Sequence, residues 1–276
     1  MTLALLLKAG EDRLRSAGVG EWRTDAWMLL EYALPVTRKD YLLERGRQAA
    51  SEEYTRYEAL LEKRSRRVPL QYLTGCQEFM GLSFDVSPDV LIPRQDTEIL
   101  VEECLKFMRS GMRVLDLCTG SGCILLSILK LAQGTEGVGT DLSERALAVA
   151  RRNGERLGIH AEWLLSDLFE VVGGSFDRIV SNPPYIPTEV IRTLEPEVQK
   201  HEPRMALDGG ADGLTFYRKI TEQSPRYLRN GGMLFLEIGS EQAGEVSALM
   251  ETHFTNIRIV KDLAGLDRVV YGTVRA

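Results

Sequence analysis

The chain has 276 residues, of which 44% are hydrophobic and 27% charged, a composition typical of a globular protein with one or two domains. No apolar run approaches the roughly 20 residues that a membrane-spanning helix needs, and the first seven residues lack the basic region of a signal peptide. We therefore expect a cytoplasmic protein without a membrane partner. The net charge of -6 argues against a protein that holds nucleic acid through its phosphates.

Up to about residue 70 the apolar residues recur at helical spacing. One helix is predicted from Asp25 and another from Ser51, because each side chain can cap a first turn. Glycines and a proline separate several short helices, so residues 1–75 are predicted to form a small helical domain. This part is mildly basic, with 13 Lys and Arg against 11 Asp and Glu, whereas the remainder has 21 against 29.

Residues 76–93 change to an alternation of apolar and polar side chains. Two apolar residues precede the turn sequence Ser87-Pro88-Asp89 and two follow it, namely Phe84, Val86, Val90 and Ile92. The pattern predicts a β-hairpin that links two domains.

From residue 94 to residue 276 the chain alternates strand and helix, which predicts a doubly wound α/β sheet. Too few residues separate the last two strands for a crossover helix, so the final strand is predicted to be antiparallel. The seven expected strands are 113–118, 137–142, 162–165, 178–181, 233–238, 256–260 and 268–273.

A glycine-bearing turn at Gly120 and Gly122 follows the first of these strands and precedes an apolar helix. Such a turn lets the backbone approach a ligand and presents free N–H groups to an anion. Asp141 lies 21 residues after Gly120, where a carboxylate can bind a ribose, but Leu125 stands where a dinucleotide loop needs its third glycine. The loop therefore favours a nucleoside without a pyrophosphate.

S-adenosylmethionine fits that profile, because it has a ribose for Asp141 and a carboxylate for the loop but no phosphate. Asp116 could bind its ammonium group or order the loop. The cysteines and histidines add no metal or redox site, since none has the spacing of a ligand set or a C-x-x-C pair. They are Cys76, Cys104, Cys118, Cys123, His160, His201 and His253.

The most specific motif is Asn182-Pro183-Pro184-Tyr185, which follows an apolar strand and so lies at the carboxyl end of the sheet. The two prolines lack N–H donors, so the Asn182 oxygen and the Pro183 carbonyl can accept both hydrogens of an NH2 group. Tyr185 can offer its flat face to a planar acceptor. This arrangement predicts in-line methyl transfer to an amide-like nitrogen, without a strong general base. A rigid turn around a packed tyrosine is the alternative.

These motifs resemble the release factor glutamine methyltransferases, the HemK-like or PrmC family of class I methyltransferases, along nearly the whole chain. The segments that carry the resemblance are 67–75, 91–98, 116–122, 182–187 and 202–214. The resemblance implies methylation of the glutamine in the Gly-Gly-Gln loop of bacterial-type release factors, with S-adenosylhomocysteine as the second product. Asn182, Pro183, Pro184 and Tyr185 would hold that glutamine, and the first, second and fourth would act in catalysis. The implied cofactor contacts are Cys118, Thr119, Gly120, Ser121, Gly122, Asp141, Leu168 and Asn182.

Two residues depart from the family pattern. Cys118 stands where glycine is frequent, and Leu168 replaces an aromatic residue beside the adenine. Neither removes a reactive group, so they bear on adenine packing rather than on activity.

Related enzymes modify a ribosomal-protein glutamine or the amino group of a nucleobase, and both stay open as alternatives. Gln71 favours the release factor branch, and the acidic charge counts against a nucleic acid substrate. A protein that binds the cofactor without catalysis is a third alternative, which the intact 182–185 motif disfavours. We expect a monomer.

The resemblance also implies that the helical domain contacts the release factor. The exposed charges of Arg64 and Arg66 would steer an acidic partner, whereas Lys63 is interpreted as part of a solvated helix face. Arg67 belongs to a family motif and is expected to be structural. Residues 188–213 are rich in Glu, Pro and Gly and are predicted to form a lid.

Overall fold

A computed structural model describes residues 1–275, and their contacts divide the chain into two compact units. The N-terminal unit comprises Met1–Gly75 together with Glu195–His201. The sheet unit comprises Cys76–Leu194 and the chain from Glu202 onwards. Over the described range, no helix is long and apolar enough to cross a membrane.

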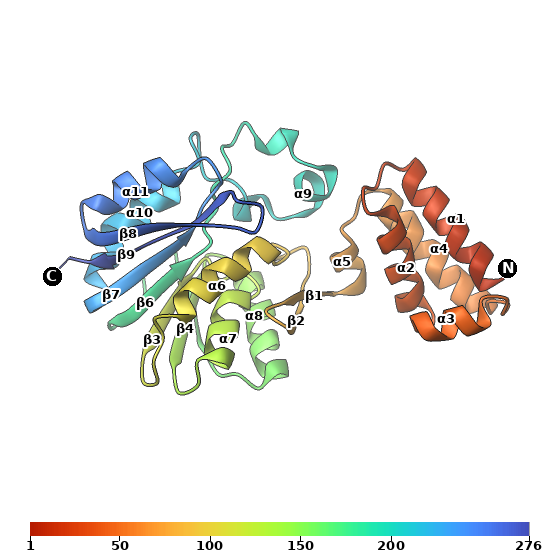
Figure 1. Cartoon of the computed structure of the whole chain (residues 1–276), viewed down its shortest axis with the longest axis horizontal. Helices are drawn as coiled ribbons and strands as arrows, with labels where there is room; N and C mark the ends of the chain where they lie inside the picture. Colours follow the sequence, from red (N-terminus) through yellow and green to blue (C-terminus); the bar gives the residue numbers. More distant parts are fainter. Residues whose placement is uncertain (276) are drawn as a thin grey trace. The chain divides into compact units, whose positions relative to one another are not determined.

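The N-terminal unit is a helical bundle around one apolar core. Tyr57 is fully buried in it, and its hydroxyl donates to the carbonyl of Ala26 at 3.0 Å. A Cβ at Gly10 would lie 2.0 Å from that hydroxyl, so only glycine lets the helices that carry Gly10 and Tyr57 approach so closely. The helices are α1 Leu3–Ser16, α2 Trp22–Ala33, α3 Arg38–Glu44, α4 Ser51–Ser65, α5 Leu70–Thr74 and α9 Pro196–His201 (Figure 1).

Both predicted helix caps in this unit are wrong. Asp25 lies inside α2, which begins at Trp22, and Ser51 is the first residue of α4 rather than its cap. At the start of α4 the Glu53 side chain accepts instead from the backbone N–H of Ala50, at 2.8 Å.

The Asp25 carboxylate is used in tertiary structure. Its Oδ2 is 2.7 Å from Nε of Arg64, and Nη1 of Arg64 is 2.8 Å from Oε1 of Glu197 on α9. Arg67 binds both oxygens of Glu197, so the two arginines lower the pKa of that carboxyl although burial alone would raise it. Arg64 was predicted to face solvent, and this prediction is wrong because its guanidinium compensates two carboxylates inside the unit.

The sheet unit contains a seven-stranded sheet with the order β5-β4-β3-β6-β7-β9-β8. Strands β3 to β7 run parallel, whereas β9 is antiparallel to both of its neighbours. The predicted doubly wound sheet with an antiparallel last strand is therefore confirmed. Its strands are β3 Arg113–Leu117, β4 Glu136–Asp141, β5 Glu162–Leu165, β6 Phe176–Ser181, β7 Leu228–Glu237, β8 Phe254–Lys261 and β9 Asp267–Val274.

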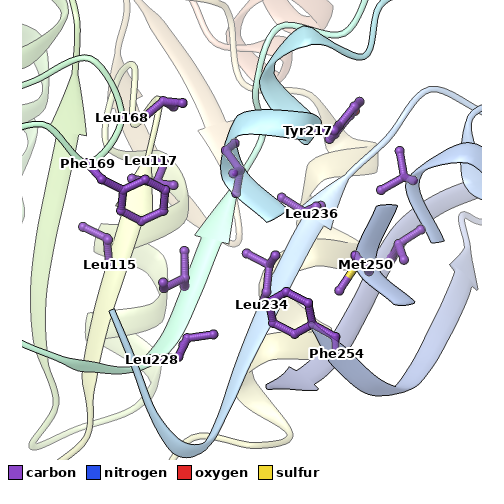
Figure 2. Packing of buried hydrophobic residues seen from close by; sticks show 14 of the residues in the cluster. Leu115, Leu117, Leu168, Phe169, Tyr217, Leu228, Leu234, Leu236, Met250 and Phe254 are labelled. Atoms are coloured by element: carbon purple, nitrogen blue, oxygen red, sulfur yellow. The ribbon is translucent and has the colours of Figure 1, made fainter. Parts of the chain in front are cut away.

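Alternate side chains of the central strands enter two apolar cores, one on each face of the sheet. Leu115, Leu234 and Leu236 point into the core on the face of α10 and α11; Figure 2 shows Leu115 beside Phe169, and Leu234 and Leu236 nearer to Tyr217 and Met250. Val114 and Phe235 point the other way, towards α6 and α7. The helices are α6 Glu98–Leu105, α7 Cys123–Leu131, α8 Glu144–Leu157, α10 Thr215–Gln223 and α11 Ala243–Glu251, with 3₁₀ turns η1 Gln95–Thr97, η2 Ile191–Thr193, η3 Arg204–Ala206 and η4 Ser224–Arg226 (Figure 1).

The predicted hairpin exists but is displaced towards the N-terminus. Strands β1 Cys76–Phe79 and β2 Leu82–Asp85 are joined at Met80 and Gly81, whose φ angles of 51° and 71° suit a two-residue hairpin turn. The predicted turn at 87–89 does not join two strands, because residues 86–92 contain no strand; Val86, Val90 and Ile92 are buried there instead. The hairpin belongs to the sheet unit, where the Asn153 side chain of α8 binds both the N–H and the carbonyl of Asp85.

Candidate active site

A pocket of about 260 Å³ lies at the carboxyl edge of the sheet, where β3, β4 and β6 end. Most of the predicted cofactor residues line it. These are Cys118, Thr119, Gly120, Ser121, Asp141, Leu168 and Asn182, whereas Gly122 lies behind the pocket wall.

The glycine loop has two kinds of glycine. Gly120 has a φ of 55°, and no atom lies within 4 Å of the position that a Cβ would take there, which leaves room for a ligand. Gly122 has a φ of 80° and precedes α7, and a Cβ there would lie 2.9 Å from the ring of Trp163. The first glycine therefore opens the pocket, and the second permits the packing behind it.

Asp141 ends β4 and holds the loop in place. Its Oδ2 accepts from the N–H of Gly120 and its Oδ1 from that of Ser143, each at 2.9 Å. Burial raises the pKa of this carboxyl, while the two N–H donors oppose that rise. Each oxygen keeps a further lone pair, so the group can also accept from a ligand hydroxyl.

Asp116 holds the glycine loop in place from the side away from the pocket. Its Oδ2 accepts from the Thr119 hydroxyl at 2.6 Å, and its side chain is fully buried and does not line the pocket. Its Oδ1 has no hydrogen-bond partner within residues 1–275. Burial raises the pKa of this carboxyl to about 7.

Both departures from the family pattern occupy left-handed backbone conformations. Cys118 has a φ of 58° and Leu168 a φ of 51°, and both line the pocket. A side chain in this region costs roughly 1–2 kcal/mol, so the pocket wall holds strained backbone. Cys118 therefore stands at a position that glycine would occupy without strain.

The 182–185 motif follows β6 directly. Asn182 and Pro184 line the pocket, whereas Pro183 is buried and Tyr185 does not line it. The Tyr185 hydroxyl lies 3.5 Å from Oε1 of Glu237. A Cβ at Gly209 would lie 2.7 Å from Cα of Tyr185, so the 202–214 segment holds the motif by close backbone packing.

Thr97 and Glu237 are site residues that the sequence analysis did not assign. The side-chain nitrogen of Asn182 donates to the Thr97 hydroxyl at 3.3 Å, and Thr97 also lines the pocket. Glu237 ends β7, the strand next to β6. A carboxylate at the end of the apolar run Met233 to Leu236 was the available signal, because such strand ends meet ligands in open α/β sheets. For Thr97 the signal was its place in the 91–98 motif.

This sheet, with its glycine loop and the 182–185 motif at one edge, is the framework of a methyltransferase. Two family models match the chain: the PrmC N-terminal domain over residues 6–75 and the methyltransferase small domain over residues 94–194. A methyltransferase from Pyrococcus furiosus has the same fold, with a TM-score of 0.55 at 18% identity over 77% of this chain and 98% of that one.

Curated relatives define the family more closely. The release factor glutamine methyltransferase of Caulobacter vibrioides is 44% identical, covering 99% of this chain and 96% of its own length. That of Geobacter sulfurreducens is 43% identical, covering 99% and 97%. The chain belongs to the family of release factor glutamine methyltransferases.

Proposed function

We propose that the chain transfers a methyl group from S-adenosylmethionine to the side-chain nitrogen, N5, of the glutamine in the Gly-Gly-Gln motif of bacterial-type release factors. The observation that carries the proposal is a pocket that the glycine loop and the 182–185 motif line together. The names of the relatives support a release factor as the partner.

The residues of the pocket fit S-adenosylmethionine. Gly120 leaves open space beside the start of α7, whose positive end suits a carboxylate, and Asp141 has lone pairs for ribose hydroxyls. Leu142 and Leu168 supply apolar surface for an adenine. When bound, S-adenosylmethionine supplies a methyl group on a positively charged sulfur.

Asn182 and Pro183 are the groups that we propose to act on the acceptor. The Asn182 side-chain oxygen and the Pro183 carbonyl each accept one hydrogen of the glutamine NH2 group, which directs its lone pair out of the amide plane. Tyr185 does not line the pocket, so the amide is held by Asn182 and Pro183 rather than by its ring. The nitrogen becomes acidic as it gains the methyl group, so its proton passes to water without a dedicated base.

Residues 1–75 are the part that we propose to recognise the release factor, in a monomeric cytoplasmic enzyme. Because Arg64 is buried, the steering charge predicted for Arg64 and Arg66 falls to Arg66, which is exposed. Residues 188–213 contain η2, α9 and η3, and Met205 and Asp208 from this segment line the pocket. We propose that it covers the acceptor when the partner binds.

Mass spectrometry tests the function. Purified release factors and ribosomal proteins are incubated with the full chain and methyl-labelled cofactor, and we expect label on the Gly-Gly-Gln glutamine. Asn182→Ala should lose this activity, while Asn230→Ala, at an exposed position in β7, should keep it. Label confined to a ribosomal protein or to RNA would replace the proposal by one of the alternatives.

A further inference from the structure

Both ends of the 182–185 motif lie on buried polar side chains: Asn182 on Thr97, in the pocket wall, and Tyr185 on Glu237, behind it. Thr97 and Glu237 are each 2% exposed. The Thr97 hydroxyl accepts from Nδ2 of Asn182 at 3.3 Å and lies beside the Glu237 carboxyl, whose pKa it lowers. The Tyr185 hydroxyl is 3.5 Å from the same carboxyl. In the described part of the chain, Oε2 of Glu237 has no hydrogen-bond partner.

The direction of these hydrogen bonds, from donor to acceptor, decides how the side-chain amide of Asn182 is oriented. A threonine hydroxyl has one hydrogen, and a neighbouring carboxylate can only accept. If Thr97 donates to Glu237, its lone pairs face Asn182, which must then present its NH2 group. The Asn182 oxygen is left on the opposite side of the amide, free to accept from a substrate.

We propose that Thr97 and Glu237 are positioning residues, which fix the amide of Asn182 with its oxygen towards the substrate while Glu237 is ionised. The proposal deepens the proposed function and rests on it, because Asn182 is the group that would hold the glutamine NH2. Neither residue needs to touch the reacting atoms. Together they prevent the one rotation of Asn182 that would turn a donor towards the substrate NH2 group.

Protonation of Glu237 would release this constraint. A protonated carboxyl can donate to Thr97, whose own hydrogen then becomes free to bind the Asn182 oxygen and stabilise the rotated amide. Burial raises the pKa of Glu237 to about 7, against the opposing effects of Thr97 and Arg268. The titratable and charged groups that act on this carboxyl, or on which it acts, are Asp96, Cys123, Tyr185, Tyr217 and Arg268.

The rate constant of methyl transfer should depend on pH through the ionisation of Glu237. Glu237 is ionised above its raised pKa, so the rate constant of methyl transfer should be constant at high pH. It should fall by up to tenfold per pH unit as pH drops below that pKa. Glu237→Gln cannot ionise, so its rate constant should be low and should not change over this range.

The test uses the full chain, a release factor and single-turnover kinetics across pH. Thr97→Val keeps the side-chain shape without the hydroxyl and should lower the rate constant by about 10- to 100-fold, as small misplacements of a positioning group do. Thr97→Ser restores the hydroxyl and should recover most of that loss. Thr221→Val removes another buried threonine hydroxyl, on α10, and should leave the rate constant unchanged.

A second measurement needs no substrate. The side-chain NH2 signals of Asn182 in nuclear magnetic resonance should titrate with Glu237 in the wild type, but not in Thr97→Val or Glu237→Gln. Wild-type activity in Thr97→Val, equal losses in Thr97→Val and Thr97→Ser, or a wild-type pH profile in Glu237→Gln would each overturn the proposal. An inactive wild type would overturn the proposed function, and the Asn182 titration would then decide the positioning role by itself.

Discussion

Arg64 of the N-terminal unit and two carboxyls of the sheet unit are buried in opposite ways. In the N-terminal unit, Arg64 is bonded to both Asp25 and Glu197, and Arg67 binds the same glutamate. In the sheet unit, Asp116 and Glu237 are buried with one oxygen each lacking a hydrogen-bond partner within the described residues. The pairs in the first unit are complete, whereas the carboxyls in the second are only partly compensated.

This difference distinguishes carboxyls that stabilise the fold from carboxyls that lie at the active site. A complete set of partners makes a buried charge tolerable and ties distant segments together, as Glu197 ties α9 to α4. An incomplete set leaves a carboxyl whose protonation changes near neutral pH, and both such groups lie behind the pocket. The two buried carboxyls with an unbonded oxygen therefore lie beside the pocket, whereas fully paired ones, which in the sheet unit include Glu202 and Asp262, serve the fold.

The largest expected effect is at Arg64. Its side chain is 7% exposed, so Arg64→Glu places a like charge beside the buried carboxylate of Asp25 and the largely buried one of Glu197. It should lower the free energy of unfolding of the N-terminal unit by about 3–5 kcal/mol. Denaturant unfolding followed by tryptophan fluorescence measures this. Arg66→Glu is the matched control, because Arg66 is 75% exposed and its ion pair is worth at most about 1 kcal/mol. Equal losses in the two variants would show that the buried ion pairs of Arg64 stabilise the unit no more than an exposed ion pair does.

Asp116 should have the next largest effect, through pH. Its pKa is raised from 3.8 to about 7 in the folded chain, so the folded state retains a proton that the unfolded state releases. Stability is therefore lost as pH rises through this window, by about 3 kcal/mol. Asp116→Asn does not titrate and should become more stable relative to wild type by that amount between pH 4 and pH 7. A constant difference between the two unfolding curves would show that Asp116 is ionised throughout.

Asp141 sharpens the comparison, because both of its oxygens are bonded and yet it faces the pocket. Asp141→Ala should weaken S-adenosylmethionine binding by about 1.5–3 kcal/mol, through loss of a charged acceptor and of the bond to Gly120. Calorimetric titration measures it. Asp141→Asn keeps one neutral acceptor and should show a smaller loss. Unchanged affinity in Asp141→Ala would exclude the ribose role.

The sheet could be predicted because its central strands β3, β6 and the second half of β7 are buried on both faces and read as apolar runs. All seven were placed to within a few residues, although β7 begins at Leu228, five residues before its predicted start. The hairpin was misplaced because the apolar alternation continues past β2, while the turn depends on Gly81 in a left-handed conformation.

Charges were harder to predict, because their roles depend on partners far along the chain. Asp25 was interpreted as a cap and Arg64 as a surface charge, yet each is the partner of the other, 39 positions apart. Glu237 was missed because its neighbours, Tyr185 and Thr97, are supplied by two other segments. The local sequence pattern predicts where the strand ends, but only the folded chain shows which side chains meet at that end.

The smallest expected effect tests the exposed charge of the N-terminal unit. With Arg64 buried, Arg66 is a charge of the 63–66 run that can act on a partner through solvent. Arg66→Glu should slow association with an acidic release factor about twofold to fivefold at low salt, and the difference should vanish near 0.5 M salt because exposed charges are screened. Stopped-flow association kinetics measure this, and cofactor affinity should not change.

Lys130→Glu is the matched control. Lys130 is exposed at the end of α7, and α7 begins at the pocket edge and so ends at the opposite edge of the sheet. If both variants slow association equally, net charge rather than the N-terminal unit steers the partner. If neither does, the basic residues at 63–66 serve only the fold of that unit, as Arg64 already does.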